Sequence, residues 1–497
     1  MPLAKLNIPA GISNNKSEYA EEGRWVDCDL VRFKDGKPQK MGGWINNTDF
    51  STFAGACRGL FTYRSDNGSI YYLAGTNEKV YLNDGGSQLD ITPSSYNHGV
   101  LNSTFQYGFG VGTYGTSTYG TARTSSTLSL DATTWSFDTF QEYVLAQPTS
   151  GQLYSFRVGT DSVLQTVTNA PVSNQYMLVS DQQHIICFGA GNDRQTISWC
   201  SAGSLTDWTA TATNSAGSLT LTDDSFIRCA RKTRSGILVF TDRNVYLMSY
   251  LGSPFYYGVN RVASNCGTLS NKATVAIQDQ LFFMGHNDFF LFNGGVQSIP
   301  CPVHEYIFGD LNKFQSAKVF GGLNPDFNEI IWFYPSSGST ENDRYVIYNY
   351  KEGSWAIGNL QRTAWLGDRD LPKPLATDLS GEVYSHEEGT SNNGTAFTSF
   401  ITSAPFDIGE GETIMKIDEI IPDFKNVTDT VNLQFTTKLQ PQGSDTTHTA
   451  SSITSSTQRI PVRVQGRQAK IKIQSTSLTA DWKLGNFKYG IYQGGKR

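Results

Sequence analysis

The chain has 497 residues, a net charge of −6 at pH 7 and only 17% charged residues. This length exceeds one ordinary core and suits a large repeat domain with one or two smaller domains. The net negative charge argues against a protein that binds nucleic acid tightly through its phosphates, but it suits a wall along which DNA slides without being bound. The many Gly, Tyr and Phe residues favour strands and turns, and no long stretch has apolar residues at helical spacing.

Residues 1–60 do not follow the pattern of the rest of the chain. Val26, Leu30 and Phe33 alternate with charged residues, as in exposed or edge strands. We expect an N-terminal arm that docks either on the rest of its own chain or on a neighbouring subunit. Trp25 is its candidate subunit contact. The polar start of the chain predicts no secretory signal.

Residues 61–390 contain a recurring hairpin pattern, which is clearest in Leu281–Gly295 (LFFMGHNDFFLFNGG). Two apolar runs flank a Gly/Asn/Asp corner, and both runs are apolar on both faces, so the hairpin is expected to lie buried between neighbours. The other units with this order are Tyr71–Gly86, Glu142–Gly159, His184–Trp199, Ile237–Gly252, Glu329–Gly358 and Ala376–Gly389. Most units start about 40–50 residues apart, which is the spacing of propeller blades. The sequence therefore predicts an all-β protein with a β-propeller of six to eight blades, the alternative being a long meander or a stacked sandwich.

A low-complexity insertion of Tyr, Gly, Thr and Ser occupies about residues 97–136. It has too little aliphatic surface for a core of its own. Its G-x-G-x-x-G at Gly110 lacks a following helix, so no dinucleotide site is expected. We expect an extended loop that makes subunit contacts through Tyr114, Tyr119 and Arg123.

A basic cluster lies in the middle of the chain. Its members are Arg228, Arg231, Lys232 and Arg234. One interpretation is a contact with DNA or an acidic partner. The other is a solvated strand edge paired with Asp223 and Asp224.

Residues 391–497 change character and predict a C-terminal β-sandwich-like domain. The expected strands are Phe397–Ile401, Met415–Ile421, Val431–Thr437, Ile460–Val464 and Ala469–Ile473. Period-2 alternation places Val464 and Ile471 towards a core. The charged side chains between the apolar ones are candidate contacts with DNA or a partner protein, or else a solvated strand face. They are Arg463, Arg467, Lys470 and Lys472.

Residues for catalysis or metal binding form no recognisable motif. No two of the six histidines have metal-ligand spacing, and the seven cysteines are scattered, as expected of reduced, mostly buried thiols. There is no nucleophile elbow and no phosphate-binding loop. No apolar run approaches the roughly 20 residues needed to span a bilayer. The sequence thus predicts no catalytic residue, no cofactor and no metal site.

Several segments resemble one family. The opening Gly11–Trp44 and the insertion Tyr114–Thr121, which runs on into Thr134–Ala146, look like parts of structural proteins of short-tailed (podovirus) bacteriophages. Phe240–Gly295 resembles the middle of the tail nozzle protein of these phages, also called the tail hub or packaged-DNA stabilisation protein. The end of the chain, Trp482–Gly485 followed by GGKR, resembles the end of the same family.

The resemblance implies a structural virion protein rather than an enzyme. Members of the family are propellers that assemble as homohexamers below the portal and the tail adaptor protein, after synthesis in the host cytoplasm. They extend the DNA ejection channel, retain packaged double-stranded DNA through transient contact, carry tail fibres or spikes and can meet the host surface. The alternative is a glycan-binding or depolymerising receptor-recognition propeller, for which Trp332, Trp355 and Trp365 are the nearest candidates.

Overall fold

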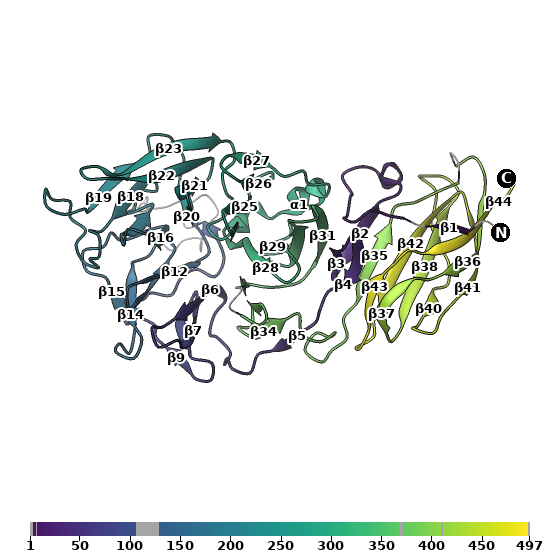
Figure 1. The fold of residues 1–497 in the computed structure, drawn as a ribbon, viewed down its shortest axis with the longest axis horizontal. Helices are drawn as coiled ribbons and strands as arrows, with labels where there is room; N and C mark the ends of the chain where they lie inside the picture. The colour runs from purple at the N-terminus through teal and green to yellow at the C-terminus, as the bar shows by residue number, and fades with distance from the viewer. Residues whose placement is uncertain (1–2, 6, 106–128, 368–370, 409–410, 496–497) are drawn as a thin grey trace, which may run out of the picture.

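The computed structural model describes residues 3–5, 7–105, 129–367, 371–408 and 411–495. Figure 1 shows an elongated molecule in which a wheel of small sheets lies beside a smaller β-domain that holds both chain ends. The described residues are almost all strands and turns. The predicted fold class, a β-propeller with a C-terminal β-sandwich-like domain, is confirmed.

Seven four-stranded antiparallel sheets of the described residues form the blades of the propeller. Blades 1 to 3 are β6 (Cys57–Arg64), β7 (Ile70–Thr76), β8 (Val80–Asn83) and β9 (Gln88–Asp90); β12 (Trp135–Phe140), β13 (Tyr143–Pro148), β14 (Tyr154–Arg157) and β15 (Gln165–Thr166); and β16 (Tyr176–Val179), β17 (Ile185–Phe188), β18 (Thr196–Trp199) and β19 (Gly217–Thr220). Blades 4 to 6 are β20 (Ile227–Thr233), β21 (Gly236–Thr241), β22 (Asn244–Gly252) and β23 (Tyr256–Ser264); β24 (Thr274–Ile277), β25 (Gln280–Met284), β26 (Phe289–Phe292) and β27 (Val296–Ser298); and β28 (Phe320–Asn324), β29 (Glu329–Tyr334), β30 (Arg344–Asn349) and β31 (Ser354–Asn359). Blade 7 is β32 (Ala364–Leu366), β33 (Leu375–Thr377), β34 (Val383–His386) and β5 (Trp44–Asn46).

The seven hairpins predicted from the sequence are the second and third strands of the seven blades. In blade 5, Leu281 is 1% exposed and Phe282, on the opposite face of β25, is 3% exposed, as expected of a strand covered on both faces. The first strand of each blade lies innermost, because first strands of neighbouring blades contact one another in the order β24, β28, β32, β6, β12, β16 and β20. These seven strands therefore line the axis of the wheel.

The ring is closed by a strand from the other end of the sequence. β5 pairs with β34 through Ser385↔Ile45 and supplies the outermost strand of blade 7. Trp44 of β5 is 4% exposed and stacks on His386 and Phe397. The Asn392 side chain accepts a hydrogen bond of 2.6 Å from its indole Nε1. Blade 7 is thus complete only when the N-terminal segment is in place.

The C-terminal domain packs three sheets around one apolar core. Their orders are β2-β35-β42-β38-β39 with β40 beside β38, β1-β44-β36-β41, and β3-β4-β43-β37. The N-terminal strands in them are β1 (Leu3–Lys5), β2 (Trp25–Asp29), β3 (Val31–Lys34) and β4 (Lys37–Lys40). The others are β35 (Ser399–Ser403), β36 (Met415–Ile421), β37 (Phe424–Thr428), β38 (Val431–Lys438), β39 (Thr446–Thr447), β40 (Ser451–Ile453), β41 (Ile460–Gly466), β42 (Gln468–Ser475), β43 (Asp481–Leu484) and β44 (Lys488–Gln493). All five strands expected in this domain are present, with β36 at the predicted bounds.

Residues 1–60, expected as an arm of their own, are divided between both domains. β1 to β4 belong to the C-terminal sheets and β5 belongs to the propeller. One apolar core runs from Trp332 of blade 6 through Val31 of the arm to Ile417 of the C-terminal domain. Of the two alternatives left open by the sequence, docking on its own chain is therefore the one that the structure adopts. Burial of apolar surface at this junction holds the two domains together as one body.

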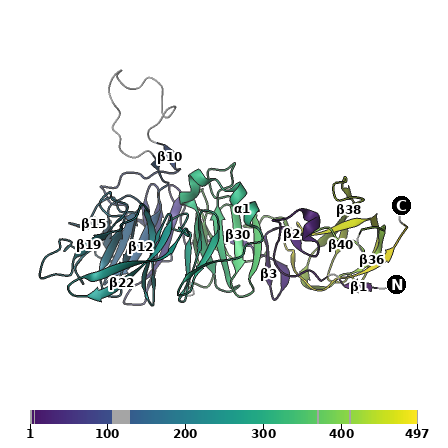
Figure 2. The same cartoon turned by 90° about the horizontal axis from the view of Figure 1, so that it is seen from above.

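Helices are few and lie near the propeller rim and the junction. They are η1 (Glu18–Glu21), α1 (His304–Asp310) and η2 (Lys313–Lys318). The insertion leaves the propeller through a two-stranded stem, β10 (Thr104–Phe105) and β11 (Ser129–Leu130). Figure 2 shows β10 and α1 on the same face of the molecule.

Candidate functional site

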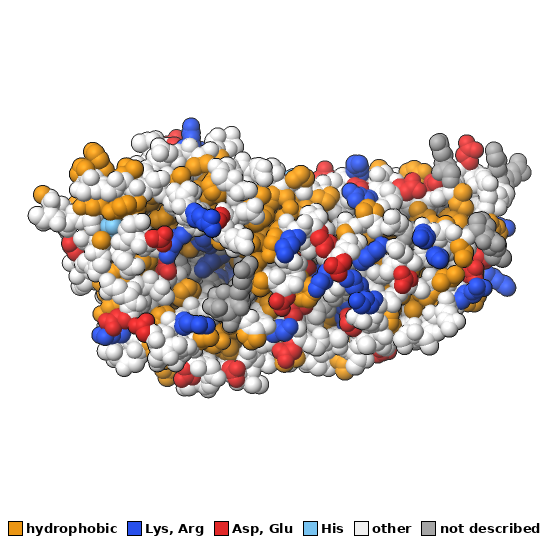
Figure 3. Space-filling view, in the orientation of Figure 1, with side chains coloured by type: hydrophobic (Ala, Val, Ile, Leu, Met, Phe, Trp, Pro, Cys, Tyr) orange, Lys and Arg blue, Asp and Glu red, His pale blue; other side chains and the backbone are white. Residues whose placement is uncertain are grey.

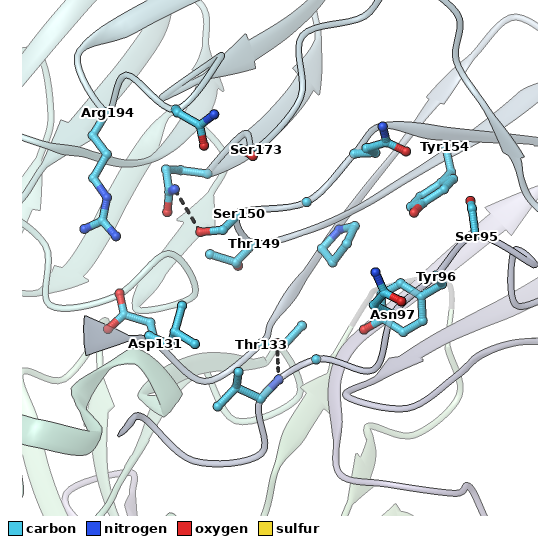
Figure 4. Close-up of a pocket in the computed structure, with 18 residues that line it drawn as sticks. Ser95, Tyr96, Asn97, Asp131, Thr133, Thr149, Ser150, Tyr154, Ser173 and Arg194 are labelled. Atoms are coloured by element: carbon cyan, nitrogen blue, oxygen red, sulfur yellow. Dashed lines mark hydrogen bonds between the residues drawn. The ribbon is translucent and has the colours of Figure 1, made fainter. Parts of the chain in front are cut away.

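A cavity of about 620 Å³ opens among blades 1, 2 and 3, beside the stem of the insertion. Figure 4 shows that its wall is formed mainly by hydroxyl and amide side chains with two tyrosines. Thr133 Oγ1 accepts a hydrogen bond of 2.8 Å from the backbone of Val100, and Gln175 donates to Ser150 at 3.0 Å. These bonds fix the wall as a rigid polar surface.

The electrostatics of this cavity are nearly neutral. The charged side chains in its described lining are Asp131 and Arg194. Asp131 forms an ion pair of 3.1 Å with Arg228. Burial raises the pKa of the Tyr96 hydroxyl. This described lining offers hydrogen bonds to a polar group but does not contain the pair of carboxylates used by most glycosidases.

A second cavity, of about 400 Å³, lies at the junction of the two domains. Tyr306 of α1 accepts a hydrogen bond of 2.8 Å from Arg344 Nη1, and Arg344 lies 3.7 Å from Asp310. Asp27 of β2 lines the same cavity, where burial raises its pKa. The junction is thus polar on this side, although its core is apolar.

The four residues proposed as subunit contacts fall into two groups. Tyr114, Tyr119 and Arg123 lie outside the described residues, and the stem β10–β11 fixes only where their segment begins and ends. Trp25 is 2% exposed, inside the core at the junction. The expectation that Trp25 contacts a neighbouring subunit is wrong, because its side chain packs within its own chain.

The four C-terminal basic residues do not form one patch. Arg463 is exposed on β41, whereas Lys470 and Lys472 lie on β42, which belongs to a different sheet. Lys470 forms an ion pair with Glu18, and Lys472 lies 4.2 Å from the centre of the Phe400 ring. Arg467 lies in the turn between the two strands. The prediction of which side chains face outward, made from the period-2 alternation, is confirmed. The four basic residues do not, however, form a single binding face.

Three of the four residues of the mid-chain basic cluster pair with carboxylates from other segments of the chain. Arg228 pairs with Asp131 at 3.1 Å, Lys232 with Asp138 at 3.8 Å and Arg234 with Asp279 at 3.2 Å. Asp223, one of the expected partners, instead accepts hydrogen bonds from Ser225, Asn244 and Tyr246. The expected pairing with Asp223 and Asp224 is therefore wrong, because those carboxylates lie in the loop before the strand.

The three tryptophans considered for glycan stacking are core residues. Trp332 and Trp355 are at most 1% exposed, and their indole Nε1 atoms donate to the carbonyls of Ala273 at 2.9 Å and Pro300 at 3.0 Å. Trp365, 9% exposed, reaches the edge of a cavity near the propeller axis. They do not form an open aromatic platform.

Within the described ranges, no group of three or more His, Cys, Asp or Glu side chains is placed to hold a metal ion. All seven cysteines are free thiols. In the same part of the chain, no helix has the length and apolar character needed to cross a membrane.

No protein-family model and no curated protein matches this sequence. Among solved structures, the WD40 β-propeller domain of Doa1 aligns with a TM-score of 0.41 and 11% identity, covering 69% of this chain and 97% of that chain. The β-propeller domain of Cps50 (Swd1) from Myceliophteria thermophila aligns with a TM-score of 0.40 and 9% identity, covering 67% and 98%. These likenesses concern fold alone, and the assignment as a seven-bladed β-propeller rests on the sheet topology of the described residues.

Proposed function

We propose that this protein is a structural subunit of a virus particle, the distal tail nozzle of a short-tailed bacteriophage. In this proposal several copies close into a ring that extends the DNA ejection channel. The resembling segments support it, and those that lie among the described residues contribute strands to the propeller or to the C-terminal domain. Gly11–Trp44 joins the two domains, Phe240–Gly295 runs from the end of β21 to just past β26 of blade 5, and Trp482–Gly485 covers most of β43.

The observation that carries the proposal is the joining of the two domains by the N-terminal segment. A ring with a head-to-tail interface closes only if each subunit presents its two contact surfaces at a fixed angle. Here the arm contributes strands to both domains, and the apolar core is continuous across the junction. A subunit of this kind is rigid enough to set the angle of a closed ring.

The charge of the chain fits a conduit for DNA. Each copy adds a net charge of −6. A wall rich in lysine and arginine would hold double-stranded DNA by counterion release, whereas a neutral or acidic wall lets it pass. We infer that contact with DNA is transient and that the stable partners are other proteins: further copies of this chain, a tail adaptor, and a tail fibre or spike.

Two parts of the chain are assigned to partner contacts. The insertion that carries Tyr114, Tyr119 and Arg123 is assigned to the contact between subunits, since its stem leaves the face that also bears α1. Arg463 is assigned to an acidic partner protein, because it is exposed on the outer face of β41.

The test is the state of assembly of the full-length chain, alone and with the adaptor ring of the same phage. Mass photometry and electron microscopy are expected to find a closed ring, six copies on the resemblance. The double variant Tyr114→Ser with Tyr119→Ser should reduce ring formation without changing the melting temperature. The matched control is Tyr492→Ser, since Tyr492 is an exposed tyrosine on the C-terminal strand β44. Monomers under all conditions, with the adaptor ring present, would overturn the proposal, and specific binding or cleavage on a glycan array would favour the receptor-recognition alternative.

A further inference from the structure

A two-stranded ribbon projects from blade 4 at the turn between β22 and β23. Among the described residues, β21 pairs with residues 245–248 of β22, whereas β23 pairs with β22 as far as Gly252↔Tyr256. Residues 249–257 therefore extend past the end of β21 as a hairpin, which we call the blade 4 ribbon. In Figure 2, β22 runs to the face of the propeller opposite the stem strand β10.

The base of the ribbon is held by blade 3. The Tyr257 hydroxyl donates a hydrogen bond of 2.9 Å to Ser180 Oγ, and its ring lies edge-on to Trp199 with 5.1 Å between the ring centroids. Tyr250 lies edge-on to Tyr257, with 5.5 Å between their centroids. Because these contacts fix the ribbon against the propeller, little conformational entropy is lost when its tip binds a partner.

The tip of the ribbon exposes large apolar side chains. Phe255 is 75% exposed, Leu251 62% and Tyr250 46%, and Phe255 is the most exposed large apolar residue of the described chain. Residues 244–260 contain no Asp, Glu, Lys, Arg or His. Figure 3 shows hydrophobic side chains gathered on the surface over blades 3 and 4. Contiguous exposed apolar patches of this kind often mark a contact with a membrane or with another protein.

Polarity rises along the ribbon from its tip towards the blade. Phe255 lies in the turn itself, Leu251 lies beside the turn, and Tyr250 with its hydroxyl follows on β22. The exposed Arg261 lies five residues beyond Tyr256, the first residue of β23, which is roughly 16 Å at about 3.3 Å per residue. A bilayer surface changes in the same order, from acyl chains through the level at which Tyr is enriched to the charged headgroups.

The exposed apolar area is small for a stable protein interface. With roughly 200 Å² for a full side chain of this size, Phe255, Leu251 and Tyr250 together expose on the order of 350 Å². A stable interface buries about 800 Å² on each partner. Insertion into a bilayer needs less area, since a single acyl chain already gives weak, reversible membrane binding. The small area and the order of the side chains therefore favour a lipid surface over a second copy of this chain.

We propose that the tip of the blade 4 ribbon inserts into the surface of a lipid bilayer. Phe255 and Leu251 enter the boundary between headgroups and acyl chains, and the Tyr250 ring lies at the level of the headgroups. The contact is peripheral, and one copy binds reversibly with a partition constant of about 10⁴ M⁻¹. Asp181, next to Ser180, is exposed at the base of the ribbon, so anionic lipids add little affinity. This inference does not depend on the proposed tail function.

The experiment uses the full-length chain and vesicles of phosphatidylcholine at about 1 mM lipid, roughly tenfold above half-saturation for such a constant. Flotation through a density gradient measures the bound fraction, and the wild type is expected to float with the vesicles. The double variant Leu251→Ser with Phe255→Ser should lower the partition constant at least tenfold, because it removes the apolar surface that is buried on insertion. Its melting temperature should not change, since both side chains are exposed.

The matched control is the double variant Leu439→Ser with Tyr492→Ser. Leu439 is 62% exposed, like Leu251, and Tyr492 is 43% exposed, but both lie in the C-terminal domain. This variant should float like the wild type. Equal flotation of the tip variant and the wild type would overturn the proposal and leave the tip as a contact with another protein.

Phe255→Trp provides a second readout. The variant should retain binding, and its added fluorescence should shift to the blue with vesicles and be quenched by lipids brominated on their acyl chains. Replacing part of the phosphatidylcholine with phosphatidylglycerol separates insertion from electrostatic adsorption, and insertion predicts little change in the partition constant. The proposal is also overturned if the wild type does not float with phosphatidylcholine vesicles, or if its binding requires the anionic lipid.

Discussion

Arg32 Nε lies 3.2 Å from Glu329 Oε1, and both side chains are at most 1% exposed. The same guanidinium donates to both carboxylate oxygens of Glu387, with 2.9 Å between Nη1 and Oε2. Arg32 belongs to the N-terminal arm, Glu329 begins β29 of blade 6, and Glu387 follows blade 7. One arginine therefore ties the arm to two blades of the propeller at the junction of the domains.

Removal of this arginine should be strongly destabilising. Arg32→Met leaves the buried Glu329 and Glu387 side chains without their cation, and breaking a buried pair in this way costs about 3–5 kcal/mol. The free energy of unfolding, measured by chemical denaturation, should fall by that amount. Arg234→Gln is the control, since it breaks an ion pair that is largely exposed and should change stability by less than about 1 kcal/mol. A similar small effect from both variants would contradict the role of Arg32.

The same cluster predicts a pH dependence of stability. Burial raises the pKa of Glu329 to about 8, although Arg32 beside it acts in the opposite direction. In the unfolded chain a glutamate titrates near pH 4.3, so the folded state holds a proton that the unfolded state releases. The stabilising contribution is full below about pH 4 and is lost as the pH rises through the folded pKa.

Glu329→Gln isolates this effect. The variant should lose less stability than the wild type as the pH rises from 5 to 8, by up to about 1.4 kcal/mol per pH unit. Denaturation curves recorded across this range measure the difference. Parallel curves for the two proteins would mean that Glu329 is already ionised in the folded state.

The closing strand β5 makes a prediction about the propeller. Trp44→Ala removes a buried indole that stacks on His386 and Phe397, and such large-to-small changes cost about 3–5 kcal/mol. Blade 7 should then open first, which limited proteolysis would detect as early cleavage near β33 and β34. Ile45→Ala on the same strand is the control, because Ile45 is 37% exposed and should matter little. Equal protease resistance in both variants would argue against closure by β5.

Much of the fold could be predicted because its signals are local. The apolar runs and the Gly/Asn/Asp corners of segments such as Leu281–Gly295 specify hairpins by strand pleat and turn geometry alone. The regular spacing of these hairpins along the chain then indicates that they are blades of a propeller. The alternation in Ile460–Val464 likewise fixed which side chains face the C-terminal core. The pairing of Arg228 was not predictable in this way, since its partner Asp131 is far away in the sequence.

The candidate cavity could not be predicted from the sequence. Its lining among blades 1, 2 and 3 comes from separate segments, with side chains such as Tyr96, Thr133 and Gln175 that carry no signal of their own. Arg32 was similarly indistinguishable from the other charged residues of the arm until folding placed it beside Glu329 and Glu387.

By itself, the sequence determined the strands, their buried faces and the repeated unit, because these follow from the period of the side chains and from turn chemistry within a few residues. The tertiary structure decided which distant segments meet: β5 with β34, β2 with β35, and Arg32 with its two glutamates. Strand edges offer the same backbone donors and acceptors to any partner, so the choice among partners depends on the packing free energy of the whole chain rather than on any local pattern.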